Sequence, residues 1–181
     1  MGMDERLLVA QLQDSRTLDA AFKILMAEYK ERLYWHIRKI VLNHDDTDDV
    51  LQDTFIKVYR NIGNFKGESK LYSWMYRIAT NESITFLTKR SREMKIDNEA
   101  LHSYMVDNLT SDVYFDGDEI QMKLQKAIAL LPQKQQLVFN MRYFDEIKYE
   151  EMSEILDTSV GALKASYHHA TKKIEDYLTK D

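Results

Sequence analysis

The sequence predicts an all-α fold made of two small helical domains that are joined by an acidic flexible linker. One proline and five glycines in 181 residues leave few points at which long helices must stop. Apolar residues recur at spacings of three and four along most of the chain, as on the buried stripe of a helix. Valine and threonine never cluster in alternating runs, so no strand is expected.

Charge is arranged in blocks, and these divide the chain into a first domain at 1–92, a linker at 93–118 and a second domain at 119–181. The net charge is −5, but lysine and arginine outnumber glutamate within 57–92. The linker is mostly acidic and shows no clean helical or strand period. The expected picture is two basic surfaces separated by an acidic connection.

The first domain is expected to contain three helices. The first covers about 18–41, and the second covers 48–62, with Thr47 or Asp48 as its cap and Gly63 at its end. The second helix buries one stripe, formed by Leu51, Phe55, Val58 and Ile62.

A polar loop at 64–70 precedes the third helix, which covers 71–92. Its apolar stripe includes Trp74, which is expected to lie in the core, as large aromatic residues at helical spacing usually do. Tyr72 and Tyr76 fall off that stripe, so they are expected to be exposed.

The second domain ends in a helix-turn-helix pattern. One helix stops before Pro132 and another covers 133–144. A short helix at 149–156 is followed by the turn residues Asp157, Thr158 and Ser159, of which the last can cap a longer helix. The longer helix buries one stripe and shows small and basic residues outside, which suits the DNA major groove. A plain packing hairpin with a solvated face has the same pattern.

Several classes of site are not expected. The chain has no cysteine, which excludes disulfides and thiolate metal ligands. No glycine-rich phosphate loop, HExxH motif or nucleophile–base pair is present, so neither an enzyme nor a cofactor is expected. Adjacent His168 and His169 lack a third metal ligand nearby, and Glu99 with His102 is expected to be solvent-exposed in the linker. Without a signal peptide or an apolar run of roughly 20 residues, a cytoplasmic protein with no membrane insertion is expected.

Two long segments resemble a known family. The first is 45–81, DDTDDVLQDTFIKVYRNIGNFKGESKLYSWMYRIATN, which resembles region 2 of extracytoplasmic-function sigma factors. The second is 131–174, LPQKQQLVFNMRYFDEIKYEEMSEILDTSVGALKASYHHATKKI, which resembles their region 4. The resemblance implies a promoter-specificity subunit that binds RNA polymerase core and promoter DNA, helps to melt the DNA, and answers to an anti-sigma factor.

The resemblance assigns core-polymerase binding to the second helix. Its solvent side carries four candidate residues, Asp48, Asp49, Gln52 and Asp53. A carboxylate row there suits a basic polymerase helix and favours fast, selective encounter. An acidic helix start that only complements the helix dipole explains the same residues equally well.

The loop at 64–70 and the helix after it resemble the part of the family that captures the melted −10 strand. Aromatic faces for bases and cations for phosphates are what single-stranded DNA requires. The candidates are Phe65, Lys66, Ser69, Tyr72, Tyr76, Arg77 and Asn81. Among them, Phe65 and Asn81 match pocket positions for a flipped base, whereas Thr85 stands where the family commonly has Asp.

The last helix is expected to recognise the −35 element. The candidates are Ser159, Lys164, Ala165, His168, His169, Lys172 and Lys173. The family often has several arginines on this helix, and their scarcity here implies weak phosphate attraction.

Two other functions remain compatible with parts of the pattern. A dimeric helix-turn-helix regulator would bind a palindromic site without polymerase. A helical interaction module would bind no nucleic acid, but the basic and aromatic segment at 65–77 argues against it.

Overall fold

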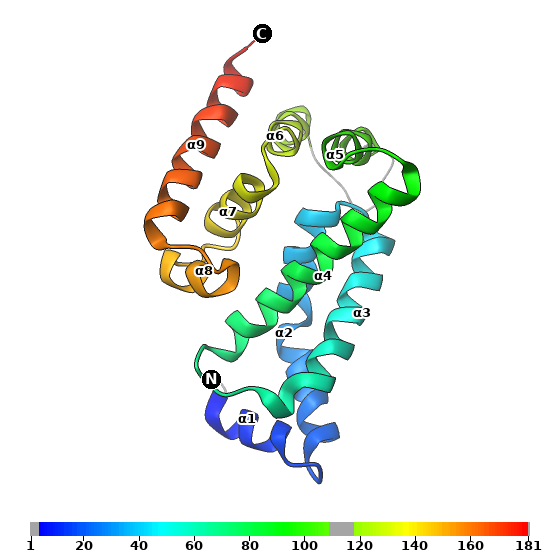
Figure 1. The fold of residues 1–181 in the computed structure, drawn as a ribbon, viewed down its shortest axis with the longest axis vertical. Coiled ribbons are helices and arrows are strands. Elements are labelled where there is room, and N and C mark those ends of the chain that lie inside the picture. The colour runs from blue at the N-terminus through cyan, green and yellow to red at the C-terminus, as the bar shows by residue number, and fades with distance from the viewer. Residues whose placement is uncertain (1–3, 109–117, 181) are drawn as a thin grey trace.

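The computed structural model describes residues 4–108 and 118–180, and every regular element in these ranges is a helix (Figure 1). The predicted all-α class with two helical units is confirmed. No helix in these ranges is long and apolar enough to cross a membrane. In chain order the elements are α1 (Glu5–Gln13), α2 (Leu18–Val41), α3 (His44–Asn61), the 3-10 helix η1 (Ile62–Asn64), α4 (Leu71–Met94), α5 (Asn98–Asp107), α6 (Glu119–Ala129), α7 (Gln133–Tyr143), α8 (Tyr149–Leu156) and α9 (Val160–Thr179).

Helices α2, α3 and α4 pack against one another to form the first unit, with α1 across its lower end (Figure 1). The predicted first helix agrees with α2. The second helix, α3, begins four residues earlier than expected, because Asn43 is its cap: the Asn43 side chain accepts a hydrogen bond from the Asp46 amide at 2.9 Å. Helix α1 was not predicted. It packs on α2 through the buried Leu8 and Leu12.

The expectation that Tyr72 and Tyr76 are exposed is wrong. They retain only 8% and 2% of their accessible surface, because α4 turns them toward α2. The Arg32 guanidinium lies 4.1 Å from the centre of the Tyr72 ring, and the His36 ring stacks on Tyr76 at 4.3 Å. Burial raises the pKa of Tyr76. These rings therefore support the first unit from inside.

The expectation of a linker without regular structure is wrong for Asn98–Asp107, which form α5. Asp97 caps this helix by accepting a hydrogen bond from the Ala100 amide at 2.7 Å. Leu101 and Val106 are buried, and α5 packs between α4 and α6. The rest of the predicted linker, at 109–117, lies outside the described residues.

His102 is also buried rather than exposed, because it lies on the packed side of α5. Within the described residues its Nε2 atom has no hydrogen-bond partner. Burial lowers the pKa of its imidazole, since the charged form would lose its hydration.

Helices α6 to α9 form the second unit, in which α9 packs on α6, α7 and α8. The predicted helix-turn-helix is confirmed, with α8 and α9 at the expected positions. Asp157 ends α8 in the left-handed conformation at φ 49°, and the Ser159 hydroxyl accepts a hydrogen bond from the Ala162 amide at 3.2 Å. These local signals explain why the sequence predicts this part so closely.

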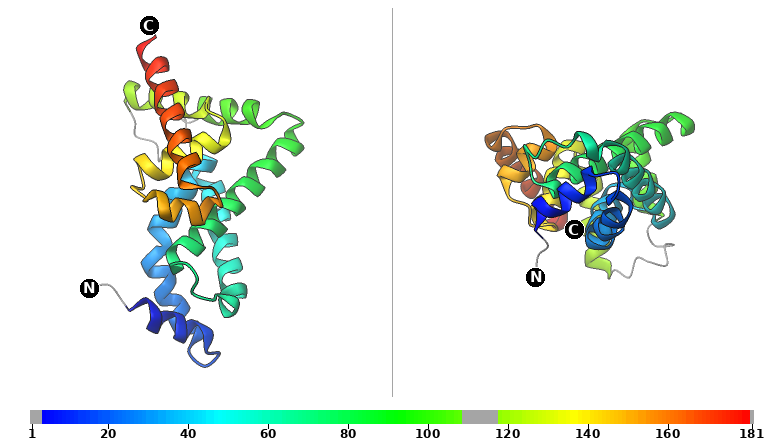
Figure 2. Two further views of the ribbon diagram at one scale, coloured as in Figure 1. Left: turned by 60° about the vertical axis from the view of Figure 1, so that its left-hand side comes forward. Right: turned by 90° about the horizontal axis from the view of Figure 1, so that it is seen from below.

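One apolar cluster extends across both units, beside a separate cluster within the second unit. Met152 and Ile155 of α8 are buried in the same cluster as Met75 and Ala79 of α4. Figures 1 and 2 show α4 running between α8 on one side and α2 with α3 on the other. The Lys39 ammonium on α2 bonds Asp145 of the α7–α8 loop at 2.6 Å. In this structure the helix-turn-helix therefore lies directly against the first unit.

The buried histidines predict a loss of stability in mild acid. The folded-state pKa values of His36 and His102 are lowered by burial, whereas an unfolded histidine has a pKa of about 6.5. The unfolded chain therefore binds more protons below that pH, and stability falls as pH falls through it. We expect the melting temperature to decrease from pH 7.5 to 5.5.

The matched variants His102→Gln, which is buried, and His169→Gln, which is exposed, separate this effect from surface charge. His102→Gln should make the decrease shallower, because glutamine does not titrate. Equal slopes in both variants would contradict the assignment to His102. Calorimetry across the pH series provides the measurement.

Candidate functional site

The exposed side of α3 carries a row of acidic and amide groups. Asp48, Asp49, Gln52 and Asp53 are all exposed, as the sequence predicts, while Leu51 on the other side of the helix is buried. Asp48 Oδ2 lies 3.3 Å from the Nε2 atom of His44 one turn earlier. The row ends beside an apolar groove.

This groove lies between α2 and α3 and has a volume of about 520 Å³. Ile56 and Tyr59 at its rim are 41% and 40% exposed, although both are large apolar residues. Tyr59 is fixed by a hydrogen bond that its hydroxyl donates to Asp19 at 2.8 Å. The lining consists of Phe22, Met26, Gln52, Phe55, Ile56, Tyr59 and Arg60. Sequence analysis missed Ile56 and Tyr59, although they continue the helical face of Gln52 at spacings of four and seven.

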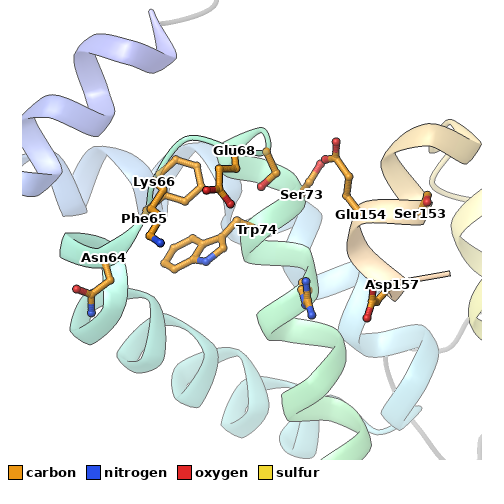
Figure 3. A pocket seen from close by; sticks show the side chains of 11 residues that line it. Asn64, Phe65, Lys66, Glu68, Ser73, Trp74, Ser153, Glu154 and Asp157 are labelled. Atoms are coloured by element: carbon orange, nitrogen blue, oxygen red, sulfur yellow. The ribbon is translucent and has the colours of Figure 1, made fainter. Parts of the chain in front are cut away.

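A cavity of about 470 Å³ opens between the loop at 65–70 and α4 (Figure 3). The rings of Phe65 and Trp74 form one wall, with their centres 5.2 Å apart and their planes tilted by 49°. Lys66 and Arg77 are exposed at its edge. The cavity thus combines aromatic faces with cations. Trp74, which was expected in the core, is only partly buried and lines this space.

The predicted −10 residues divide into three groups. Phe65, Lys66, Ser69 and Arg77 share the cavity. Asn81 is exposed one helical turn after Arg77 on α4. It lines a second hollow of about 320 Å³, to which Arg77 also contributes. Tyr72 and Tyr76 contribute to neither of these two spaces, since they face α2.

Helix α1 braces the loop of this cavity. The Gln13 side-chain amide donates to two backbone carbonyls, Ile62 O at 3.1 Å and Phe65 O at 2.7 Å. A Glu5 carboxylate oxygen accepts from the Leu71 amide at 3.0 Å and so satisfies one of the free N–H groups at the start of α4. Gly67 makes the bend at φ 72°, which glycine adopts without steric cost.

The outer face of α9 is exposed along most of its length. Leu163, Ala170 and Ile174 hold the helix in the core. Lys164 extends over the Tyr149 ring at 5.8 Å, and the Lys173 ammonium donates to Gln135 Oε1 at 3.2 Å. All the predicted −35 residues are exposed, namely Ser159, Lys164, Ala165, His168, His169, Lys172 and Lys173.

Comparison with known proteins finds matches in both units. The Sigma-70 region 2 family matches residues 25–93, and the Sigma-70 region 4 family matches residues 121–174. The first range covers the carboxylate row and most of the residues that line the groove and the cavity, whereas the second covers most of the helix-turn-helix.

Similar proteins align along nearly the whole chain. The RNA polymerase sigma-H factor of Pseudomonas aeruginosa is 28% identical over 166 residues, covering 87% of this chain and 86% of that protein. The ECF RNA polymerase sigma factor SigW of Bacillus subtilis is 29% identical, with coverage of 87% and 89%.

Solved structures share the fold. CnrH, in complex with the cytosolic domain of CnrY, superposes with a TM-score of 0.70 at 19% identity, covering 96% of each chain. The sigma factor RpoE of Bartonella quintana, in complex with the anti-sigma factor NepR, gives 0.66 at 21% identity, covering 88% of this chain and 98% of that one.

The brace from α1 predicts a local effect of Gln13→Ala. Without the side-chain amide, two carbonyls of the loop lose a donor, so the loop should open more often. We expect a loss of about 1 kcal/mol in the free energy of unfolding and faster amide hydrogen exchange at 65–69. Gln11→Ala on the same helix is the control for helix propensity. Identical exchange in the two variants would show that α1 does not brace the loop.

Proposed function

We propose that this chain, which belongs to the extracytoplasmic-function family of sigma-70-type RNA polymerase sigma factors, divides its work among three surfaces. As a sigma factor it directs core polymerase to specific promoters and initiates transcription there. We assign core binding to α3, capture of the melted −10 strand to the cavity beside α4, and −35 recognition to α9. The observation that carries this assignment is the aromatic and cationic cavity on the same chain as an exposed recognition helix.

Core binding is assigned to the carboxylate row together with the adjacent groove. The exposed Asp49 and Asp53 provide charge for encounter with a basic helix of the polymerase. Ile56 and Tyr59 provide exposed apolar surface, which supplies affinity once the charges have aligned the partners. An acidic helix start that serves only the dipole explains neither exposed apolar residue.

Strand capture is assigned to the cavity because a melted strand exposes unstacked bases and phosphates, which aromatic rings and cations can bind. A base that leaves the duplex loses stacking, and an aromatic face restores roughly 1–3 kcal/mol per base. Phe65 and Trp74 supply such faces, while Lys66 and Arg77 line the same cavity and can provide positive charge for phosphates. Asn81, in the neighbouring hollow, carries an amide that can hydrogen-bond a base edge.

Recognition of the −35 element is assigned to the exposed face of α9. The small Ala165 permits close approach to the groove, and Lys164 extends from the same face. Lys172 lies two turns later, where a phosphate contact is expected. The alternative of a dimeric regulator that acts alone accounts for α8 and α9 but leaves the region 2 surfaces without a role.

Further partners and properties follow as proposals. We infer that an anti-sigma factor controls this chain, since the structurally similar RpoE is held in complex with one. The protein acts as an initiation factor, with no catalytic activity of its own, and works in the cytoplasm alongside the polymerase. It needs no cofactor.

The proposed function is tested by run-off transcription with core polymerase on a genomic promoter library. Adding the chain should produce transcripts from a defined set of promoters that core alone does not use. A gel shift with and without core separates this from the dimeric regulator, which would bind its site unaided. Absence of both promoter-specific transcripts and core association would contradict the proposal.

The core-binding surface predicts the effect of Asp49→Lys combined with Asp53→Lys. Two repulsive charges should replace two attractive ones, so affinity for core should fall at least about tenfold while the fold is preserved. Co-purification with core and a thermal melt measure the two properties. Glu175→Lys with Asp176→Lys on α9 makes the same change of net charge at an exposed site elsewhere. If both double variants bind core equally, α3 is not in the interface.

The recognition helix predicts different roles for two lysines. Lys172→Ala should weaken binding to all −35 sequences alike and reduce its salt dependence, because a phosphate contact carries no base identity. Lys164→Ala should relax the preference at one position, at a cost of roughly 1–3 kcal/mol if it contacts a base. Holoenzyme binding to a randomised −35 library in a salt series measures both. The opposite pattern would mean that the helix is rotated from the assumed position.

A further inference from the structure

The cavity assigned to strand capture has a wall from the other unit. Besides the loop and α4, it is lined by Ser153, Glu154 and Asp157 at the end of α8 (Figure 3). These three side chains lie opposite the aromatic wall of Phe65 and Trp74. The second hollow, next to Asn81, is likewise closed from that side by Asp157 and the end of α8. Both hollows therefore lie in the contact between the two units.

The charges across this contact are complementary. The Lys70 ammonium forms an ion pair with Glu151 at the start of α8. The carboxylate of Glu151, with smaller contributions that include Glu154, raises the pKa of Lys70. Asp157 lines both hollows together with the exposed Arg77. Asp157 thus stands beside Arg77, which the proposed function assigns to DNA phosphates, and Glu151 neutralises a further cation, Lys70, of the adjoining loop.

The same contact is fixed by apolar packing and by a second ion pair. Met152 and Ile155 of α8 are buried in the apolar cluster that also contains residues of α4. On the far side of the contact, Asp145 is bonded to Lys39 at 2.6 Å, and its other oxygen lies 3.6 Å from His36 Nδ1. The closed packing is thus a specific interface rather than a loose approach of two units.

The closed packing is incompatible with a bound promoter. Elements at −35 and −10 are about 25 base pairs apart, which is roughly 85 Å at ~3.4 Å per base pair of duplex. Here Asp157, which lines the strand-capture cavity, is only two residues from Ser159 at the start of α9. The surfaces for the two elements therefore adjoin each other, and one straight duplex cannot reach both.

We propose that α8 is an intramolecular competitor of the −10 strand: Glu154 and Asp157 line the capture cavity, Glu151 pairs with Lys70 in the adjoining loop, and these carboxylates together keep the free chain closed. The inference rests on the proposed function of that cavity. DNA capture requires that α8 first leaves α4. The apparent affinity of the free chain for a single strand is then reduced by the fraction of molecules that are closed.

The test uses the full chain and a variant that removes the three charges with little change of shape, Glu151→Gln, Glu154→Gln and Asp157→Asn. Asparagine tolerates the left-handed conformation of residue 157, so the turn is preserved. The matched control, Glu150→Gln, Glu175→Gln and Asp176→Asn, removes three exposed acids of α8 and α9 and makes the same change of net charge.

Opening is measured by energy transfer between dyes on Lys30→Cys in α2 and Ala162→Cys in α9, both exposed positions. The chain has no cysteine of its own, so only these two thiols react. Strand capture is measured by anisotropy of a labelled single-stranded 12-mer of random sequence. The triple variant should show lower energy transfer than the control and bind the strand about threefold or more tightly.

Unchanged energy transfer relative to the control would overturn the proposal, because the carboxylates would not hold the units together. Lower energy transfer without tighter strand binding would also overturn it, because α8 would then not compete with the strand. Run-off transcription by the unmodified holoenzyme is scored separately. Failure to initiate transcription would contradict the proposed function. Initiation without lower energy transfer or tighter strand binding in the triple variant would contradict only the competitor role of α8.

Discussion

The structure depends on the packing of α4 on two sides at once. One side of this helix meets α2 and α3, and another meets α8. Small and hydroxyl-bearing residues make the close approach possible, and their polar groups are satisfied within the helix: Thr80 and Ser83 donate to the carbonyls of Tyr76 and Ala79 at 2.7 Å. A helix covered in this way can be buried around much of its circumference without orphaned hydroxyls at these positions. Both the internal support of the first unit and the contact with the second therefore pass through α4.

This double packing explains where sequence reasoning succeeds and fails. Helices α3 and α9 each bury one face, so their periodicity predicts the stripe and the exposed residues on the opposite side. Helix α4 is buried around most of its circumference and exposes only a narrow stripe that includes Arg77, Asn81 and Thr85. Tyr72 and Tyr76 lie off the predicted apolar stripe, yet Arg32 and His36 cover them. The helix-turn-helix is predicted closely because its turn is set by local chemistry. Helix α5 is missed because its stability comes from packing against α4 and α6 rather than from a clear apolar period of its own.

The candidate site follows the same division. Exposure of Asp49 and Asp53 can be predicted, since it requires only the phase of one helix. The groove beside them arises from α2 and α3 together, and the cavity needs the loop, α4 and α8. Trp74 shows the limit of a rule based on residue type, because an aromatic residue at the edge of a core can pack on one face and line a cavity with the other. A hollow formed by several segments depends on how they pack together, and the periodicity of a single helix does not predict that packing.

The position of the acids also bears on how an overall negative chain can bind DNA selectively. A cationic cavity that is always open would attract any nucleic acid, since phosphate attraction is independent of sequence. Carboxylates of α8 beside the same cations would suppress such binding without removing the cations. The groove assigned to core polymerase is lined by α2 and α3 alone, so a partner can engage it while α8 is still in place. Any ligand that favours separated units then shifts the equilibrium toward the open chain by its difference in affinity for the two states. The proposed order is therefore core binding first and strand capture second, because the groove is accessible in the closed chain whereas the cavity is shared with α8.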